Sequence, residues 1–274
     1  SNPFTRSTAA VSRILSVSVF QRIAWQTVHL ILFCTSAFLV FAAAWMLSQR
    51  ILQSPSGGSI AGLGAAALLI LCPAAIRYSC TLYPETFSLF LMSASLLVWT
   101  LAGVTPVRPT FLFLSFLLGF TFLYHPVHGL LIVTILGIAT LLRTKPFERN
   151  LADLACLILP ATVLVFVVSR IYLPETSRRV HAFLGRGDDL GGLRGIAWFF
   201  ERMTLDYAPH RWIMFVVLLV LVAVSWSLMD RRLRGLAVGL AGGVVTLIFL
   251  VGGKYWSSLL AFMPVLALFF GVAV

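Results

Sequence analysis

The segment Arg77-Tyr78-Ser79-Cys80-Thr81-Leu82-Tyr83-Pro84-Glu85 is polar and partly charged, and it separates two apolar runs that are each long enough to cross a bilayer. We call it the elbow. Its arginine, tyrosines and glutamate could meet an anionic headgroup or a divalent cation. Because ionisable groups are costly near membrane depth, they are candidates for function. The alternative interpretation is a helix turn with interfacial tyrosines and an arginine that reaches the membrane surface.

Composition predicts an integral, multi-pass membrane protein. The 274 residues are 60% hydrophobic and 11% charged, and the mean hydropathy is +1.00, whereas a soluble domain is about a quarter charged. The net charge of +11 comes from 20 Lys and Arg against 9 Asp and Glu, which suits anionic lipid headgroups or phosphates. The basic residues stand at the ends of apolar runs and form no stripe on a soluble module, so nucleic acid is not an expected partner.

Apolar runs separated by Pro, Gly and charged turns predict an all-α transmembrane bundle over residues 23–274, preceded by an external interfacial segment at 1–22. About nine membrane segments are expected. They are residues 23–48, 59–76 and 85–103, two short arms of a helical hairpin within 110–142 that is broken at 124–129, and then 151–172, 212–229, 236–251 and 256–274.

Two further features bear on this bundle. Residues 173–210 form a long polar loop, in which 196–207 has the apolar spacing of a helix lying in the interface. Gly235, Gly239 and Gly243 recur at every fourth residue, which lets two helices approach closely. The cysteines lack metal-type or paired spacing, and we interpret them as free, packed thiols: Cys34, Cys72, Cys80 and Cys156.

The short turns differ in charge, and this difference predicts orientation. Alternating spans place the turns at 49–58, 104–109, 143–150 and 230–235 on one side, which the positive-inside rule makes cytoplasmic. Their basic residues are Arg50, Arg108, Arg143, Lys145, Arg149, Arg231, Arg232 and Arg234. The elbow, the break at 124–129, the long loop and residues 252–256 then share the external or lumenal face.

The external face is rich in basic and aromatic residues, for which a phosphate with an attached lipid or sugar is the natural partner. Glu85 is the candidate ligand of a divalent cation, Mg or Mn, and it could instead pair with Arg77 in a salt bridge. Residues 254–256 could also be interface anchors, and His125-Pro126 a simple hairpin turn. The candidate substrate-binding residues are Arg77, Tyr83, His125, His128, Arg211, Lys254 and Tyr255.

Three stretches carry a family resemblance that runs from about residue 20 to the end of the chain. Residues 61–85 resemble the second conserved block of the polyprenyl-phosphate-sugar-dependent GT-C glycosyltransferases, which include protein mannosyltransferase-like and aminoarabinose-transferase-like enzymes. Residues 117–126 are similar to the glycine-containing helix of that superfamily, which ends in a basic residue near proline. Residues 253–264 are similar to its terminal basic-Tyr-x-x-x-Leu-x-x-x-Pro block.

The resemblance implies transfer of a sugar from a polyprenyl-phosphate lipid on the outer or lumenal face of a bacterial inner membrane or an ER-type membrane. It places Glu85 at the second acidic position of these enzymes and makes Arg77 and Lys254 candidates for the donor phosphate. Membrane lipids are further expected partners. Catalytic residues are not assigned.

The chain departs from the family pattern at one point. GT-C enzymes generally have a first helix and then an external loop whose acid orients or deprotonates the acceptor, whereas residues 1–84 contain no Asp or Glu. Three alternatives follow. The first is an enzyme whose acid lies upstream or on a partner membrane subunit. The second is a non-catalytic GT-C-like subunit of a larger membrane complex. The third is a lipid-phosphate transporter, which ionisable residues at span centres would favour, but the sequence shows none there.

Overall fold

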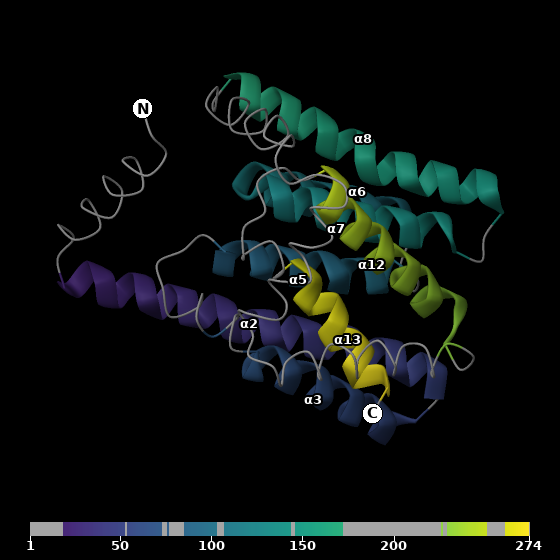
Figure 1. Ribbon diagram of the computed structural model, residues 1–274, viewed down its shortest axis with the longest axis horizontal. Coiled ribbons are helices and arrows are strands. Elements are labelled where there is room, and N and C mark those ends of the chain that lie inside the picture. The colour runs from purple at the N-terminus through teal and green to yellow at the C-terminus, as the bar shows by residue number, and fades with distance from the viewer. Residues whose placement is uncertain are drawn as a thin grey trace.

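All regular structure in the described part of the chain is helical. The computed structural model describes residues 19–52, 54–72, 76, 85–102, 107–143, 146–171, 226, 229–250 and 261–273, and no strand occurs in these ranges. The helices are α2 (Val19–Leu52), α3 (Pro55–Leu71), α5 (Glu85–Leu101), α6 (Val107–Tyr124), α7 (Pro126–Leu141), α8 (Phe147–Ile171), α12 (Arg231–Leu250) and α13 (Met263–Ala273) (Figure 1). The predicted all-α class is confirmed for these residues.

Helix α5 occupies the middle of the bundle. It contacts α2, α6, α7 and α13, and its fully buried side chains include Met92, Leu96 and Trp99. Helices α3 and α13 pack against α2 on one side, while α6 packs against α7 and α8 on the other. Figure 1 shows α3 and α8 along opposite edges of the bundle, with α5 between them. The ends of α5 therefore mark the two ends of the packed core.

Several helices begin earlier than the sequence pattern predicts. The last part of the predicted turn at 49–58 is instead the start of α3. Ser54 caps this helix by accepting the backbone N–H of Gly57 at 3.3 Å, and Pro55 occupies its first turn. Helix α6 likewise takes in Pro109, and α8 begins at Phe147 within the predicted charged turn. A proline in the first helical turn removes only an N–H that would have had no partner in the helix.

The predicted hairpin of two short arms is confirmed. Helices α6 and α7 contain 18 and 16 residues, and the break between them is the single residue His125, not the whole stretch 124–129. A Cβ atom on Gly129 would overlap the backbone of Phe122, so the absence of a side chain at Gly129 allows the two arms to meet tightly at the turn.

The predicted close approach along the glycine row is also confirmed. A Cβ atom on Gly239 would overlap the backbone carbonyl of Ile135 in α7, and one on Gly235 would lie 3.2 Å from the carbonyl oxygen of Ala139. One on Gly243 would lie 2.9 Å from Cγ1 of Ile135. Helices α12 and α7 thus pack through backbone surfaces.

Two described helical stretches are long and apolar enough to cross a membrane, namely Ile23–Ile51 and Phe147–Ser169. Helices α3, α5, α6, α7 and α13 contain shorter apolar stretches. Residues 19–22, assigned to the interfacial segment, belong to the first turn of α2. The 173–210 loop with its predicted helix, and the predicted span 212–229 apart from Trp226 and Met229, lie outside the described residues.

The cysteines correct one expectation. Cys34, Cys72 and Cys156 are free thiols, as predicted, and Cys80 lies outside the described residues. Cys72 is buried and Cys156 partly buried, but Cys34 is exposed and is therefore not a packed thiol. An apolar run in the sequence does not reveal which face of its helix packs, and Cys34 lies on the outward face of α2.

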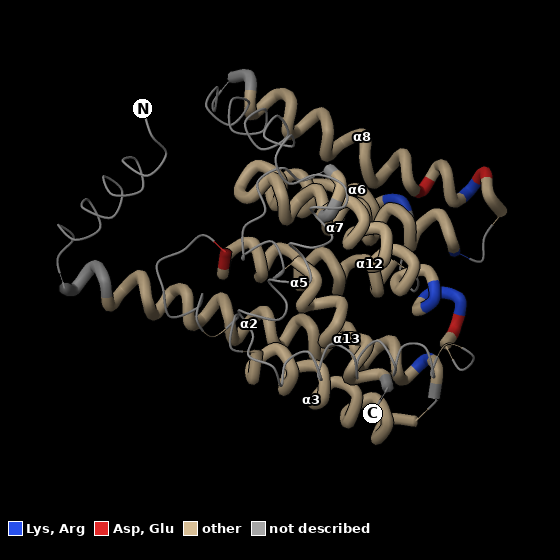
Figure 2. Tube along the Cα trace, in the orientation of Figure 1, with Lys and Arg blue, Asp and Glu red and all other residues tan. Residues whose placement is uncertain are grey.

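Most of the described charged residues lie at one end of the bundle, and Glu85 lies at the other. Figure 2 shows the Lys and Arg positions where α2 and α7 end and α8 and α12 begin. Arg50 donates to the carbonyl of Thr100 at 3.4 Å, and Arg143 donates to that of Trp99 at 3.2 Å. The ends of α2, α5 and α7 therefore meet at what we call the basic end, as the alternation of turns predicts.

Candidate functional site

A polar cluster at the opposite end joins the start of α5 to the turn between α6 and α7. Glu85 is the first residue of α5 and is nearly buried. One turn later, the hydroxyl of Ser88 donates to the Glu85 carbonyl at 3.0 Å and lies 2.5 Å from Nδ1 of His128. The cluster therefore brings together three predicted site residues, Glu85, His125 and His128, and adds Ser88.

Ser88 holds the ring of His128 in place. A serine hydroxyl has one proton to donate and lone pairs to accept, and its oxygen is within hydrogen-bond distance of both the Glu85 carbonyl and the imidazole. Which of the two atoms, Ser88 Oγ or His128 Nδ1, donates depends on the tautomer of the ring. The His128 side chain is completely buried, and its contact with Ser88 fixes the position of the ring.

The two histidines stack on each other at the start of α7. Their ring centroids are 3.7 Å apart and the rings are inclined by 18°. His125 is the N-cap of α7, where its Nδ1 accepts the backbone N–H of His128 at 3.4 Å. Burial lowers the pKa of His125 to about 4. At neutral pH, His125 therefore offers hydrogen bonding to a ligand and no positive charge, which changes the role predicted for it.

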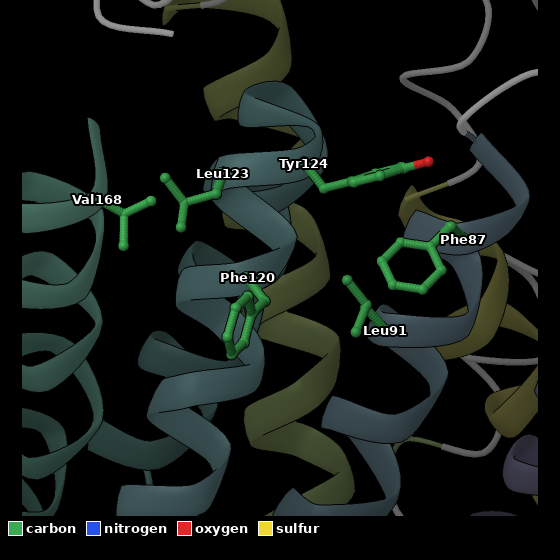
Figure 3. Close-up of a pocket in the computed structure, with 6 residues that line it drawn as sticks. All are labelled: Phe87, Leu91, Phe120, Leu123, Tyr124 and Val168. Carbon is green, nitrogen blue, oxygen red and sulfur yellow. The ribbon is translucent and has the colours of Figure 1, made fainter. Parts of the chain in front are cut away.

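An apolar pocket of about 470 Å³ adjoins this cluster. It opens between α5, α6 and α8, and Figure 3 shows the Tyr124 ring across one end of it, with the hydroxyl pointing over Phe87. The Tyr124 and Phe87 ring centroids are 4.6 Å apart, and Tyr124 lies within electrostatic range of Glu85. The lining residues are Phe87, Leu91, Phe120, Leu123, Tyr124 and Val168. Tyr124 thus joins an apolar cavity to a polar rim.

The described residues alone do not fit a divalent cation site. A hard cation requires several oxygen ligands, and no group of three or more His, Cys, Asp or Glu comes together within the described ranges. Glu85 is the one described residue to which we assign a possible cation contact. Further ligands would have to come from other parts of the chain or from the substrate.

Several predicted site residues lie outside the described part of the chain, and the sequence prediction missed others. The first group is Arg77, Tyr83, Arg211, Lys254 and Tyr255. Ser88 and Tyr124 were missed, although both had a signal. Ser88 lies one helical turn after Glu85, and Tyr124 immediately precedes His125 in the predicted hairpin break.

Comparisons of the chain with protein-family profiles, curated proteins and solved structures find no match.

Proposed function

We propose that the protein is a multi-pass membrane protein that binds a polyprenyl phosphate at the Glu85 end of the bundle and transfers the attached sugar to an acceptor on the external or lumenal face. This is the activity of a GT-C-like glycosyltransferase. The observation that supports it is the apolar pocket beside a polar cluster, which matches a ligand with a prenyl chain and a polar head. The prenyl chain would lie against Phe87, Phe120 and Tyr124.

Helix orientation supports the placement of the phosphate. Helices α5 and α7 both begin at this end, and helix N-termini carry partial positive charge that favours anions. Because His125 is neutral, the full positive charges that face the phosphate would come from Arg77, Arg211 and Lys254. Tyr83 and Tyr255 would then contact the sugar or the first prenyl units, where aromatic side chains with a polar tip are suited to a boundary between apolar and aqueous surroundings.

The chemistry requires a base that is not yet assigned. The acceptor oxygen would form a bond to the anomeric carbon while the carbon–oxygen bond to phosphate breaks, and the phosphate would leave with that electron pair. The proton of the acceptor must pass to a base. Glu85 could help to hold a divalent cation only with ligands from outside the described residues, and a salt bridge with Arg77 is the alternative role.

A second candidate function is a non-catalytic GT-C-like subunit of a larger membrane complex. Residues 1–84 contain no Asp or Glu, and this second function requires no acid among them. This subunit would bind the lipid phosphate without transferring the sugar. Sugar transfer by the purified chain would separate the two functions.

The proposed binding site can be tested by filling the pocket from α8. Val168 lines the pocket, whereas Val163 is on the same helix with an exposed side chain outside it. Val168→Trp should weaken binding of a fluorescent short-chain polyprenyl phosphate in detergent by about tenfold, which corresponds to about 1.4 kcal/mol. Val163→Trp, the matched control, should bind as the wild type does. Equal affinities of the two variants would remove the pocket from the proposal.

The headgroup requires a separate test, because the pocket variants report on the prenyl chain. The double variant Arg77→Ala, Lys254→Ala should bind the same fluorescent lipid more weakly, since each residue would contribute a charge to the phosphate. Unchanged binding would remove Arg77 and Lys254 from the proposed phosphate site.

A further inference from the structure

Guanidinium groups from separate elements lie at the basic end, opposite the candidate site. Arg50 of α2 and Arg143 after α7 donate to the carbonyls of Thr100 and Trp99. These carbonyls belong to successive residues at the end of α5, so the two guanidinium groups lie next to each other. Both also lie within electrostatic range of Arg232 in α12.

Arg143 is buried at the base of this group. Its guanidinium lies 4.9 Å from the centre of the Trp99 ring and 5.0 Å from that of Phe111. The side chain is only 8% exposed, and its Nε makes no hydrogen bond within the described ranges. The Asn150 amide donates to the Arg143 carbonyl at 3.0 Å. These contacts place a guanidinium group among aromatic rings and backbone carbonyls at the end of α5.

The carboxylates at this end balance the arginines incompletely. Asp230 lies within electrostatic range of Arg50, and Asp153 within range of Arg143. One oxygen of Asp230 already accepts the backbone N–H of Leu233 at 2.8 Å, where it caps α12. A third carboxylate, Glu148, is in the first turn of α8. Further arginines are in the first turns of α6, α8 and α12, namely Arg108, Arg149, Arg231 and Arg234, and Figure 2 shows basic positions where α8 and α12 begin. Among the described residues, this end therefore has excess positive charge.

Exposed apolar side chains adjoin the charged group in sequence. Leu142 precedes Arg143 and is 46% exposed, and Phe147 begins α8 and is 69% exposed. A soluble anion would gain nothing from these side chains, whereas the glycerol and acyl portions of a lipid would pack against them. The planar guanidinium group of arginine can donate two parallel hydrogen bonds to phosphate oxygens and carries the opposite charge.

We infer that Arg50, Arg143 and Arg232 bind the phosphate of an anionic phospholipid headgroup in the leaflet at the basic end. This inference rests on the membrane placement proposed above and not on sugar transfer. The phosphate would lie between α2 and α12, with Arg143 beneath it, and would offset the mutual repulsion of the three cations. The lipid would thereby connect elements that lie far apart in sequence.

Thermal unfolding of the full chain in mixed micelles tests the site. Phosphatidylglycerol should raise the unfolding midpoint more than phosphatidylcholine does, because a ligand that binds the folded state stabilises it. The double variant Arg50→Gln, Arg232→Gln should lose at least about half of that difference, because weaker binding of a ligand to the folded state stabilises that state less. The control Arg231→Gln, which changes an exposed neighbour of Arg232, should keep it.

Three outcomes would overturn the inference: equal stabilisation by the two lipids, an undiminished difference in the double variant, or the same stabilisation by inorganic phosphate, which would point to a soluble anion. If the double variant does not fold, Arg232→Gln alone is compared with Arg231→Gln by native mass spectrometry of co-purified phosphatidylglycerol. Polyprenyl-phosphate binding should be unchanged in the Arg232→Gln variant, so the two proposals can fail independently.

Discussion

The Ser88 hydroxyl and the His128 ring are 40 positions apart in sequence, yet their polar atoms are 2.5 Å apart. This contact joins the first turn of α5 to the first turn of α7 inside the bundle. Because Ser88 also binds the Glu85 carbonyl, one small side chain sets the relative positions of two candidate site residues. The cluster is therefore a structural unit whether or not a ligand is bound.

Removal of the Ser88 hydroxyl should be costly. Ser88→Ala removes the hydroxyl that bonds Nδ1 of the buried His128 ring, and loss of this buried hydrogen bond should lower the free energy of unfolding by about 1–3 kcal/mol. The control is Ser93→Ala, because the buried Ser93 hydroxyl bonds the Leu89 carbonyl of its own helix, a bond whose loss leaves that carbonyl paired within the helix. Denaturant unfolding in detergent measures both. Equal losses would show that the Ser88–His128 contact contributes nothing of its own.

The stability should fall as the pH is lowered through the range in which the unfolded chain protonates His125. Burial lowers the folded-state pKa of His125 to about 4 from its ordinary value of 6.5, so the unfolded state takes up a proton first. The contribution is therefore complete above pH 6.5 and is lost between pH 6.5 and about 4. Thermal unfolding midpoints across this range provide the measurement.

The matched variant for the pH test is His125→Asn. Asparagine keeps the capping function at the start of α7 but does not titrate. Its midpoints should decline less steeply with acidity than those of the wild type. Identical slopes would show that His125 is not the source of the pH dependence.

The close packing of α12 on α7 predicts a strong effect at Gly239. In Gly239→Leu, the new side chain would overlap the Ile135 carbonyl, and overpacking typically costs about 1–3 kcal/mol or more. Ala241→Leu adds a similar volume at an exposed position of the same helix and should be tolerated. Unchanged detergent stability of Gly239→Leu would mean that the glycine row faces lipid.

Membrane orientation can be tested by thiol labelling in sealed cells after the native cysteines have been replaced. A cysteine at Ser79 in the elbow should react with an impermeant reagent, and one at Ser56 beside the basic end should not, because basic short loops remain cytoplasmic. Ser56 is exposed in the fold, so its protection would not result from burial. Labelling at Ser56 but not at Ser79 would reverse the proposed orientation.

The sequence predicted helix class, hairpin and glycine row because each depends on local chemistry: apolar length, proline position and side-chain size. Helix boundaries were less predictable, since the Ser54 cap converts an apparent turn into the start of α3. Ser88 was missed because a helical serine commonly bonds its own backbone, as Ser93 does. Its bond to His128 depends on how α5 packs against α7, which no local pattern encodes.

For Arg143, the sequence predicted the charged turn but not the position of the side chain. Charge at the end of a predicted span indicated a cytoplasmic turn, but nothing indicated that the side chain would fold back between Trp99 and Phe111. That arrangement requires the end of α5, the start of α6 and the end of α7 to meet. It is a property of the tertiary packing and not of the turn.

Helix α2 is much longer than its neighbour α3, and this difference has a consequence for the surrounding bilayer. Its 29-residue apolar stretch would measure about 43 Å, whereas the 17 residues of α3 would measure about 26 Å, against a hydrocarbon thickness of about 30 Å. Even a tilt of about 40°, the upper end of the usual range, would shorten the α2 stretch only to about 33 Å. In a membrane, lipids beside α2 would therefore be stretched and those beside α3 compressed, so bilayer thickness would set the tilt of the whole bundle.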